Sequence, residues 1–373
     1  MPRNVAVLVG NGLSVAFNRE LSLQSITEEV LHRIRKLDGD DVVKAMKELA
    51  DRVLPHGANS NEDFEILVGA LGAESRTLDV LNTLAELTEP EDELLRTSIK
   101  QVADFAEQVR DSGVAHVLQV IAERSRAYQD DSENLHALTQ SIIDSHGGDV
   151  VIANLNYDTL LLSALLQTCK QEMADMGHGM QHAKVKLGKL GEHRVQKLRL
   201  EATDFPISRR VQLLHLHGSL TYWTKPDRSL QVKLDRDLVR GPHVWNAIRN
   251  KTSRIRPAVV LAARRDKAEH VAQQPFALAY EMFVKGLVNA DHWLIIGYSF
   301  RDEPVNARLR EEFLNRADKP KVLVVTYGDD PERHNVERAF GWGAEDEDND
   351  WLTIIRTGAD GAEKTPEWAM FTS

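Results

Sequence analysis

Short apolar runs recur along the chain, and several of them end in small or polar residues. The first covers residues 5–9 (VAVLV). Similar runs follow at residues 149–153, 211–216, 256–262, 292–296, 322–326 and 351–355. A run that is apolar at every position is typical of a strand that is buried on both faces, as in parallel sheets. These runs therefore predict the strands of one buried sheet.

Helical periodicity separates the predicted strands. Phe276, Tyr280, Phe283 and Leu287 recur at the spacing of one helix face, and a second set follows at residues 305, 309 and 313. Strands that alternate with helices are typical of α/β proteins. The fold class that we predict is a doubly wound, mostly parallel, Rossmann-like sheet.

Residues 21–146 show helical periodicity and no convincing strand. Residues 25–28 (SITE) have the form of a capping box, and Ile26, Val30 and Ile34 follow at helical spacing. We therefore predict a core formed by residues 1–20 and 147–373, with an inserted helical subdomain at residues 21–146. A scaffold or an oligomerisation surface is the favoured role for this insert, ahead of a catalytic one.

Residues 184–199 are basic, with Glu192 as the opposing charge. A solvated hairpin is the favoured interpretation, and a docking patch for an acidic partner is the alternative. Over the whole chain the net charge is −11, which argues against broad nucleic-acid binding.

Cys169 is the only cysteine among the 373 residues, so neither a disulfide nor a cysteine-based zinc site is expected. His178 and His182 have a ligand-like spacing but no evident third partner, and we assign them to the surface. No apolar run reaches membrane-spanning length, and we expect a cytoplasmic protein.

Four predicted strands end in small or hydrogen-bonding residues. These ends are residues 10–14 (GNGLS), 156–158 (NYD), 217–219 (HGS) and 297–299 (GYS). In open α/β sheets, ligands bind beyond the carboxyl ends of the strands. At the first end, the glycines permit a tight turn, and the helix that follows would present N–H groups to an anion such as a diphosphate.

Each strand end alone has a purely structural explanation. Residues 156–158 fit an Asx-type turn, His217 or the neighbouring His215 fits a structural histidine, and residues 297–299 fit a turn with a helix cap. The first turn has Val15 where dinucleotide-binding dehydrogenases have a third glycine, and no acidic strand end follows about 20 residues later. A hydride-transfer enzyme is therefore disfavoured.

Taken in order, the motifs GNGLS, NLNYD, LHLHGS and IIGYSF resemble the sirtuin fold family, and more closely the bacterial sirtuin-like NAD hydrolases of anti-phage defence. The residues that carry this resemblance are Gly10, Gly12, Ser14, Asn156, Asp158, His217, Gly218, Gly297 and Ser299. The chain departs from protein deacylases because it lacks their four-cysteine zinc module and has residues 17–21 (FNREL) in place of their Pro-Asp-Phe-Arg-like loop. The defence-type hydrolases share these departures.

The resemblance implies that NAD is the substrate and that no metal is needed. Water would cleave the bond between nicotinamide and ribose, giving ADP-ribose and nicotinamide. Asn156 would position this water, Asp158 would orient the site or the carboxamide, and His217 would act as the general base. The remaining contacts would come from Gly10, Asn11, Gly12 and Ser14 at the diphosphate and from Gly297 and Ser299 at the adenosine half.

Unregulated NAD hydrolysis is toxic, so the resemblance also implies a silent state that a trigger relieves. We expect a homo-oligomer that docks onto a protein partner, such as a hexameric DNA-translocating ATPase or a short Argonaute, through the helical insert or the basic segment. Two alternatives remain: a non-catalytic subunit that binds NAD or ADP-ribose, and an ADP-ribosyl-transfer or deacylase enzyme that modifies proteins.

Overall fold

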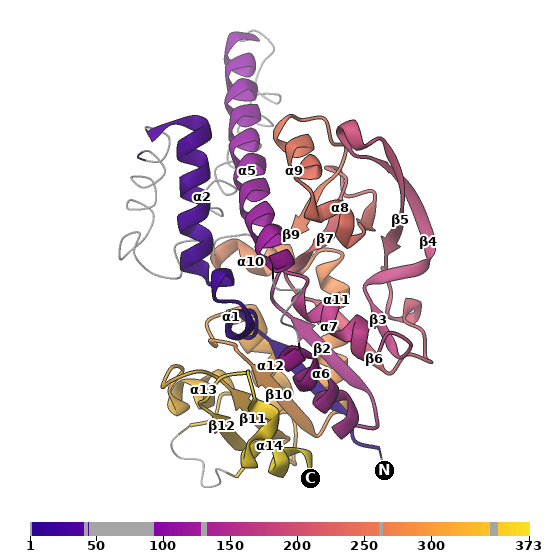
Figure 1. Ribbon diagram of the computed structural model, residues 1–373, viewed down its shortest axis with the longest axis vertical. Helices are drawn as coiled ribbons and strands as arrows, with labels where there is room; N and C mark the ends of the chain where they lie inside the picture. The colour runs from indigo at the N-terminus through magenta and orange to yellow at the C-terminus, as the bar shows by residue number, and fades with distance from the viewer. Residues whose placement is uncertain (1, 41–43, 45–92, 128–132, 261–263, 344–349) are drawn as a thin grey trace.

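The computed structural model describes residues 2–40, 44, 93–127, 133–260, 264–343 and 350–373. Within these residues, seven strands form a wholly parallel sheet in the order β12-β11-β10-β1-β2-β6-β3 (Figure 1). The strands are β1 (Val5–Val9), β2 (Val150–Asn154), β3 (Met173–Asp175), β6 (Val211–His215), β10 (His292–Ile296), β11 (Lys321–Val325) and β12 (Leu352–Ile355). The predicted doubly wound α/β sheet is confirmed.

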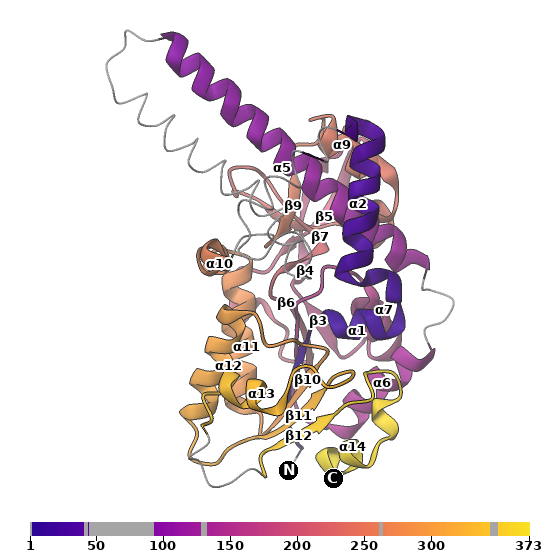
Figure 2. The same ribbon diagram turned by 90° about the vertical axis from the view of Figure 1, so that its left-hand side faces the viewer.

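Helices cover both faces of this sheet (Figure 2). Because side chains alternate along a strand, Val5, Val7 and Val9 of β1 enter one hydrophobic core, and Ala6 and Leu8 enter the other. The first core is closed by α6 (Glu133–Ser145), α7 (Leu160–Thr168) and α14 (Pro366–Thr372), and the second by α11 (Phe276–Asn289), α12 (Glu303–Leu314) and α13 (Arg333–Ala339).

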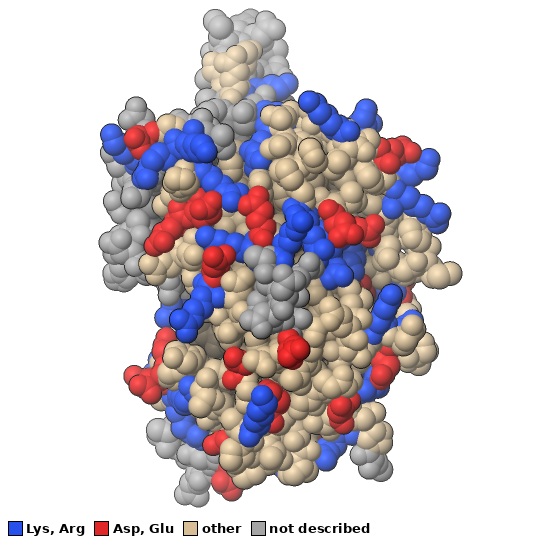
Figure 3. Space-filling model, in the orientation of Figure 1, with Lys and Arg blue, Asp and Glu red and all other residues tan. Residues whose placement is uncertain are grey.

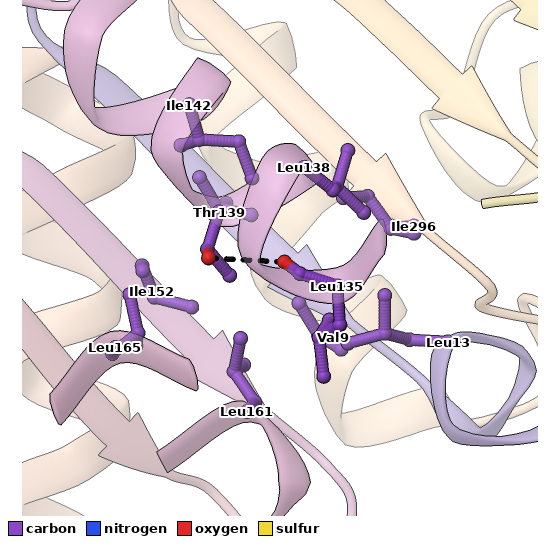
Figure 4. Close-up of a pocket in the computed structure, with 11 residues that line it drawn as sticks. Val9, Leu13, Leu135, Leu138, Thr139, Ile142, Ile152, Leu161, Leu165 and Ile296 are labelled. Atoms are coloured by element: carbon purple, nitrogen blue, oxygen red, sulfur yellow. Dashed lines mark hydrogen bonds between the residues drawn. The ribbon is translucent and has the colours of Figure 1, made fainter. Parts of the chain in front are cut away.

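A small apolar cavity of about 10 Å³ lies between β1, β2, α6 and α7 (Figure 4). The Thr139 hydroxyl at its edge donates a hydrogen bond to the Leu135 carbonyl oxygen at 3.0 Å. A space of this size holds at most about one water molecule, and its wall is otherwise apolar. It is a packing gap in the core.

A second sheet, which the apolar pattern did not reveal, contains five antiparallel strands of the described chain in the order β4-β5-β8-β7-β9. They are β4 (Gly177–Lys186), β5 (Glu192–Leu198), β7 (Gly218–Thr224), β8 (Gln231–Lys233) and β9 (Arg256–Val259). The assignment of residues 256–262 to the main sheet is wrong, because β9 pairs with β7. An apolar run indicates burial, but it does not specify which sheet provides it.

Several short helices complete the described structure, and those labelled η are 3₁₀-helices. They are α8 (Arg236–Arg240), α9 (Pro242–Arg249), α10 (Arg264–Val271), η3 (Gly188–Leu190), η4 (Ala202–Asp204) and η5 (Ala362–Lys364). The basic segment forms the hairpin of β4 and β5, as predicted, with an ion pair of 3.0 Å between Lys184 and Glu192. No helix in the described ranges is long and apolar enough to cross a membrane.

The described part of the insert contains two long helices, α2 (Leu23–Asp38) and α5 (Glu93–Ala127), which pack against each other, and also α6, which covers the main sheet. The capping box predicted at residues 25–28 is wrong: α2 begins at Leu23, and the Ser22 hydroxyl accepts a hydrogen bond from the Ser25 amide at 3.3 Å. Residues 41–43, 45–92 and 128–132 of the insert lie outside the described part. The division of the chain into two domains stays a prediction.

Buried histidines make the stability of the fold dependent on pH. Burial lowers the pKa of His292 and of His215 to about 4 each. Between pH 4 and 6.5 the unfolded chain therefore binds protons that the folded chain does not, and the free energy of unfolding falls as the pH falls. Each such histidine contributes about 1.4 kcal/mol per pH unit in this window. Urea unfolding at pH 7 and pH 5 measures this loss.

His292→Phe should reduce the slope of this pH dependence. The His292 ring lies 5.2 Å from the Phe371 ring, and its nitrogens have no hydrogen-bond partner in the described chain, so phenylalanine suits the site. His334, which is exposed on α13, provides the matched control as His334→Asn. Equal slopes for the two variants would show that His292 does not account for the acid sensitivity.

Candidate functional site

The four polar strand ends lie at one edge of the parallel sheet. They belong to β10, β1, β2 and β6, which are consecutive neighbours in the sheet. The chain passes from β1 to β2 and β6 on one side and returns through β10 on the other, so the direction of winding reverses beside β1. Such a switch point is where open α/β sheets bind ligands.

A cavity of about 590 Å³ opens at this switch point. Its volume lies in the range of pockets that enclose ligands of about the size of drugs and cofactors. Eight of the nine predicted site residues line it: Gly10, Asn11, Gly12, Asn156, Asp158, His217, Gly297 and Ser299. The structure therefore brings together residues that are far apart in the sequence.

Ser14 is the ninth predicted residue, and it lies behind the wall of the cavity. Its side chain is buried in α1 (Asn11–Phe17), and its hydroxyl donates a hydrogen bond to Asp158 Oδ2 at 2.5 Å. The same hydroxyl oxygen accepts a hydrogen bond from Asn156 Nδ2 at 2.9 Å. Ser14 thus connects two residues that reach the cavity.

The glycines of the first turn pack against the turn that follows β10. The Gly12 amide donates to the Gly297 carbonyl oxygen at 2.9 Å, and a Cβ on Gly12 would lie 2.6 Å from Gly297 Cα. Gly297 itself has a φ of +62°, which favours glycine. The expectation that this helix start leaves its N–H groups open to an anion is therefore wrong for Gly12, because its N–H already has a partner.

The orientation of the Asn156 amide follows from its hydrogen bonds. Asn156 Nδ2 donates to the Gly10 carbonyl oxygen at 2.9 Å and also to Ser14 Oγ. Because a carbonyl oxygen only accepts hydrogen bonds, the amide nitrogen must face Gly10. Asn156 Oδ1 has no hydrogen-bond donor among the described residues, so this oxygen is available to a ligand in the cavity.

Asp158 combines a structural role with its place in the cavity wall. Its Oδ1 accepts a hydrogen bond from the Leu160 amide at 2.9 Å, which is the Asx-type turn considered above. Burial raises the pKa of Asp158, although the bonds from Ser14 and Leu160 oppose this shift. The side chain holds both the start of α7 and the hydroxyl of Ser14.

His217 lies between β6 and β7 and lines the cavity with 4% of its surface exposed. Burial, reinforced by the charge of Lys267, lowers the pKa of His217 to about 3, so the ring is neutral at physiological pH. A neutral imidazole retains the lone pair that a general base needs. His215, in contrast, packs against Tyr222 and places Nδ1 3.3 Å from the Asn156 carbonyl oxygen, away from the cavity.

Three residues that the motifs did not single out surround His217. Its Nε2 lies 3.4 Å from Asp302 Oδ2 and 3.4 Å from the Tyr280 hydroxyl, and Lys267 Nζ lies 2.5 Å from the same Asp302 oxygen. An aspartate two residues before Pro304 is a helix-start signal that could have identified Asp302. Lys267 lies on the strongly polar helix α10, and no sequence pattern marks it.

The helical insert supplies an apolar wall to the cavity. This wall consists of Leu21 in η1 (Arg19–Leu21), Leu23 and Ile26 in α2, and Ile121 in α5. The insert is thus more than the scaffold that the sequence favours. The sequence did not predict that the insert lines the cavity, because the insert and the strand ends are distant in the chain and meet only in the folded structure.

The two histidines with ligand-like spacing lie on the hairpin, apart from this cavity. His178 Nε2 is 3.5 Å from Asp204 Oδ1, and His182 Nδ1 is 3.1 Å from the Met180 carbonyl oxygen. Among the residues with described side chains, no three histidine, cysteine or acidic groups gather as a metal site would require.

Comparison with known proteins agrees with this geometry. The SIR2-like domain family matches residues 150–343, which are more than half of the chain and include three of the four polar strand ends. The search of curated proteins finds no match. SIR2-like domains are in general NAD-dependent enzymes. On the extent of this match, the chain belongs to the SIR2-like family.

Proposed function

We propose that the protein is an NAD hydrolase that cleaves the bond between nicotinamide and ribose. The products are nicotinamide and ADP-ribose. The observation that carries the proposal is the pairing, in one cavity at the switch point of a SIR2-like sheet, of the open Asn156 oxygen with the neutral imidazole of His217.

The proposed chemistry follows from the leaving group. Nicotinamide departs as a neutral pyridine, and the ribose anomeric carbon takes on oxocarbenium character, as in glycoside hydrolysis. Asn156 Oδ1 accepts a hydrogen bond from the attacking water and orients it toward this carbon. His217 removes a proton from the water or from a ribose hydroxyl. Asp158 acts through Ser14 and keeps the Asn156 amide in place.

The wall of the cavity also offers groups for the rest of NAD. Two cationic side chains, Lys267 and Arg301, occur among the described lining residues, and Arg301 lies 3.7 Å from Asp330. We assign the diphosphate to the turn at Asn11, with Arg301 as a cationic group in the wall of the same cavity. Gly297 and Ser299 border the adenosine half in this arrangement.

The apolar wall gives a test of how the nicotinamide ring is held. We expect Leu23→Ala to raise the KM for NAD by about tenfold, since removal of a leucine contact costs about 1.5 kcal/mol or more. The control is Leu31→Ala, which changes a half-buried leucine on the same helix that does not line the cavity. Steady-state kinetics measure both, and an equal KM for the two variants would remove the wall from the binding site.

The NAD hydrolase hypothesis is tested against its alternatives by measuring what becomes of the ADP-ribose and the nicotinamide parts of NAD. Chain incubated with NAD labelled in the adenine should give free ADP-ribose in amounts equal to nicotinamide. A chain that binds NAD without turnover is the regulatory subunit. Label that remains covalently attached to protein identifies an ADP-ribosyl transferase, and release that depends on an acylated peptide identifies a deacylase.

We also propose that this activity serves anti-phage defence and is switched on through a protein partner. The support is the resemblance of the ordered motifs to defence-type hydrolases and the presence of an exposed basic hairpin. Figure 3 shows Lys and Arg side chains at the edge formed by β4 and β5. The proposal is that a homo-oligomer docks there or through the helical insert. Full NAD hydrolysis by an isolated monomer would contradict control by assembly.

A further inference from the structure

Asp302 lies at the start of α12, and each of its two carboxylate oxygens has a different role. Asp302 Oδ1 accepts a hydrogen bond from the Val305 amide at 3.2 Å and caps the helix. Asp302 Oδ2 is 3.4 Å from His217 Nε2 and 2.5 Å from Lys267 Nζ. The side chains of all three residues are more than nine-tenths buried. The contact with His217 is therefore shielded from water.

A carboxylate beside an imidazole nitrogen selects one tautomer. An ionised carboxylate only accepts hydrogen bonds and repels a nitrogen lone pair, so the position of Asp302 Oδ2 3.4 Å from His217 Nε2 favours a proton on Nε2. The Tyr280 hydroxyl, also 3.4 Å from Nε2, can accept or donate and adapts to either state. His217 Nδ1 has no hydrogen bond to any described residue. In the tautomer that Asp302 favours, the lone pair of the neutral ring lies on Nδ1.

Lys267 keeps the carboxylate ionised in this buried place. Burial opposes ionisation of Asp302, but the charge and hydrogen bond of the neighbouring Lys267 offset it and hold the pKa of Asp302 below its usual value. Without the ammonium group, a protonated Asp302 could donate to His217 Nε2 and reverse the tautomer. Lys267 thus acts on His217 through Asp302.

We propose that Asp302 and Lys267 are positioning residues that fix His217 in the Nε2–H tautomer and present Nδ1 as the proton-accepting atom. This inference rests on the proposed NAD hydrolysis for its catalytic consequence. The tautomer itself is a property of the chain and is measurable in the absence of NAD. The same arrangement explains why both residues are buried beside a cavity although neither belongs to a strand-end motif.

Asp302→Asn separates the two roles of this residue. Asparagine caps helices as well as aspartate does, so Oδ1 can keep its bond to Val305. The new amide group can donate to His217 Nε2 and therefore favours the opposite tautomer. We expect kcat to fall at least ~100-fold with KM within about threefold of wild type, because the loss of an orienting carboxylate acts mainly on proton transfer. The thermal midpoint should fall, because the buried Lys267 ammonium loses its ion pair with Asp302, and an unchanged far-UV circular dichroism spectrum confirms that the variant folds.

The direct readout is the nitrogen NMR spectrum of the chain labelled in its histidines, at neutral pH. His217 is assigned by the signal that is lost in His217→Gln. We expect a protonated Nε2 in the wild type, a protonated Nδ1 in Asp302→Asn, and the wild-type pattern in Tyr280→Phe. Lys267→Gln should shift the signal toward the Nδ1–H form.

The outcomes separate this inference from the proposed function. If the tautomer reverses in Asp302→Asn while the wild type cleaves no NAD, alone or with its partners, then Asp302 and Lys267 are positioning residues and the proposed function fails. If the wild type cleaves NAD but His217 already carries its proton on Nδ1, the proposed positioning role of Asp302 and Lys267 is overturned. The proposed positioning role of Asp302 and Lys267 is also overturned if Asp302→Asn changes neither the tautomer of His217 nor kcat.

Discussion

His217→Ala is expected to lower the rate of nicotinamide release from NAD by about 10²–10⁴-fold, the usual contribution of a general base. The neutral, buried imidazole lines the same cavity as Asn156, so its removal takes away the proton acceptor and leaves the rest of the wall in place. NAD affinity, measured by calorimetry, should change less than tenfold. The two measurements together separate chemistry from binding.

The matched control is His178→Ala on the β4–β5 hairpin, which should cleave NAD at the wild-type rate. Asn156→Ala should show the same loss as His217→Ala, with some loss of stability, because the Gly10 carbonyl and the Ser14 hydroxyl each lose a hydrogen-bond donor. Unchanged release by His217→Ala would exclude this histidine as the base.

Gly297→Ala is expected to have the largest effect on the fold. Gly297 has a φ of +62°, and a Cβ on it would lie 2.3 Å from the Leu13 amide nitrogen. Left-handed backbone strain and overpacking together cost about 3–5 kcal/mol in the free energy of unfolding. Urea unfolding measures the loss. NAD binding should fall with it, since the first turn must move away from β10.

Gly361→Ala is the matched control for this substitution. Gly361 also has a positive φ, +77°, but a Cβ there would meet no atom within 4 Å. Its cost should be the backbone strain alone, about 1 kcal/mol. The difference between the two variants isolates the close packing of the turns after β1 and β10. Equal losses would show that this packing contributes little.

Most of the parallel sheet was predictable because strands such as β1 are short, mostly apolar and followed by polar groups, whereas the three-residue strand β3 gave no such signal. β1 and β10 show this most clearly, and their polar ends meet because parallel neighbours end at the same edge. The second sheet was not predictable from such runs. β7 is buried along its whole length but contains Gly218, Ser219 and Thr221, and β8 has three residues, so neither gives a clear apolar signal.

The residues of the candidate site that belong to local sequence motifs could be predicted. Gly10, Asn156 and His217 lie at strand ends, where the sequence pattern marks them. Lys267 and Ile121 could not be found in this way, because their helices reach the cavity through tertiary packing. Ser14 shows the reverse case: the motif identified it, but the hydrogen bonds to Asp158 and Asn156 turn its hydroxyl into the interior.

The measurement that tests the central claim most directly is the parallel quantification of nicotinamide and ADP-ribose released from NAD by the purified chain, assayed alone and with candidate partner proteins added. The account predicts equal amounts of the two products, both lost in His217→Ala although this variant still binds NAD. Wild-type chain that binds NAD in the cavity and releases no nicotinamide, alone or with its partners, would contradict it.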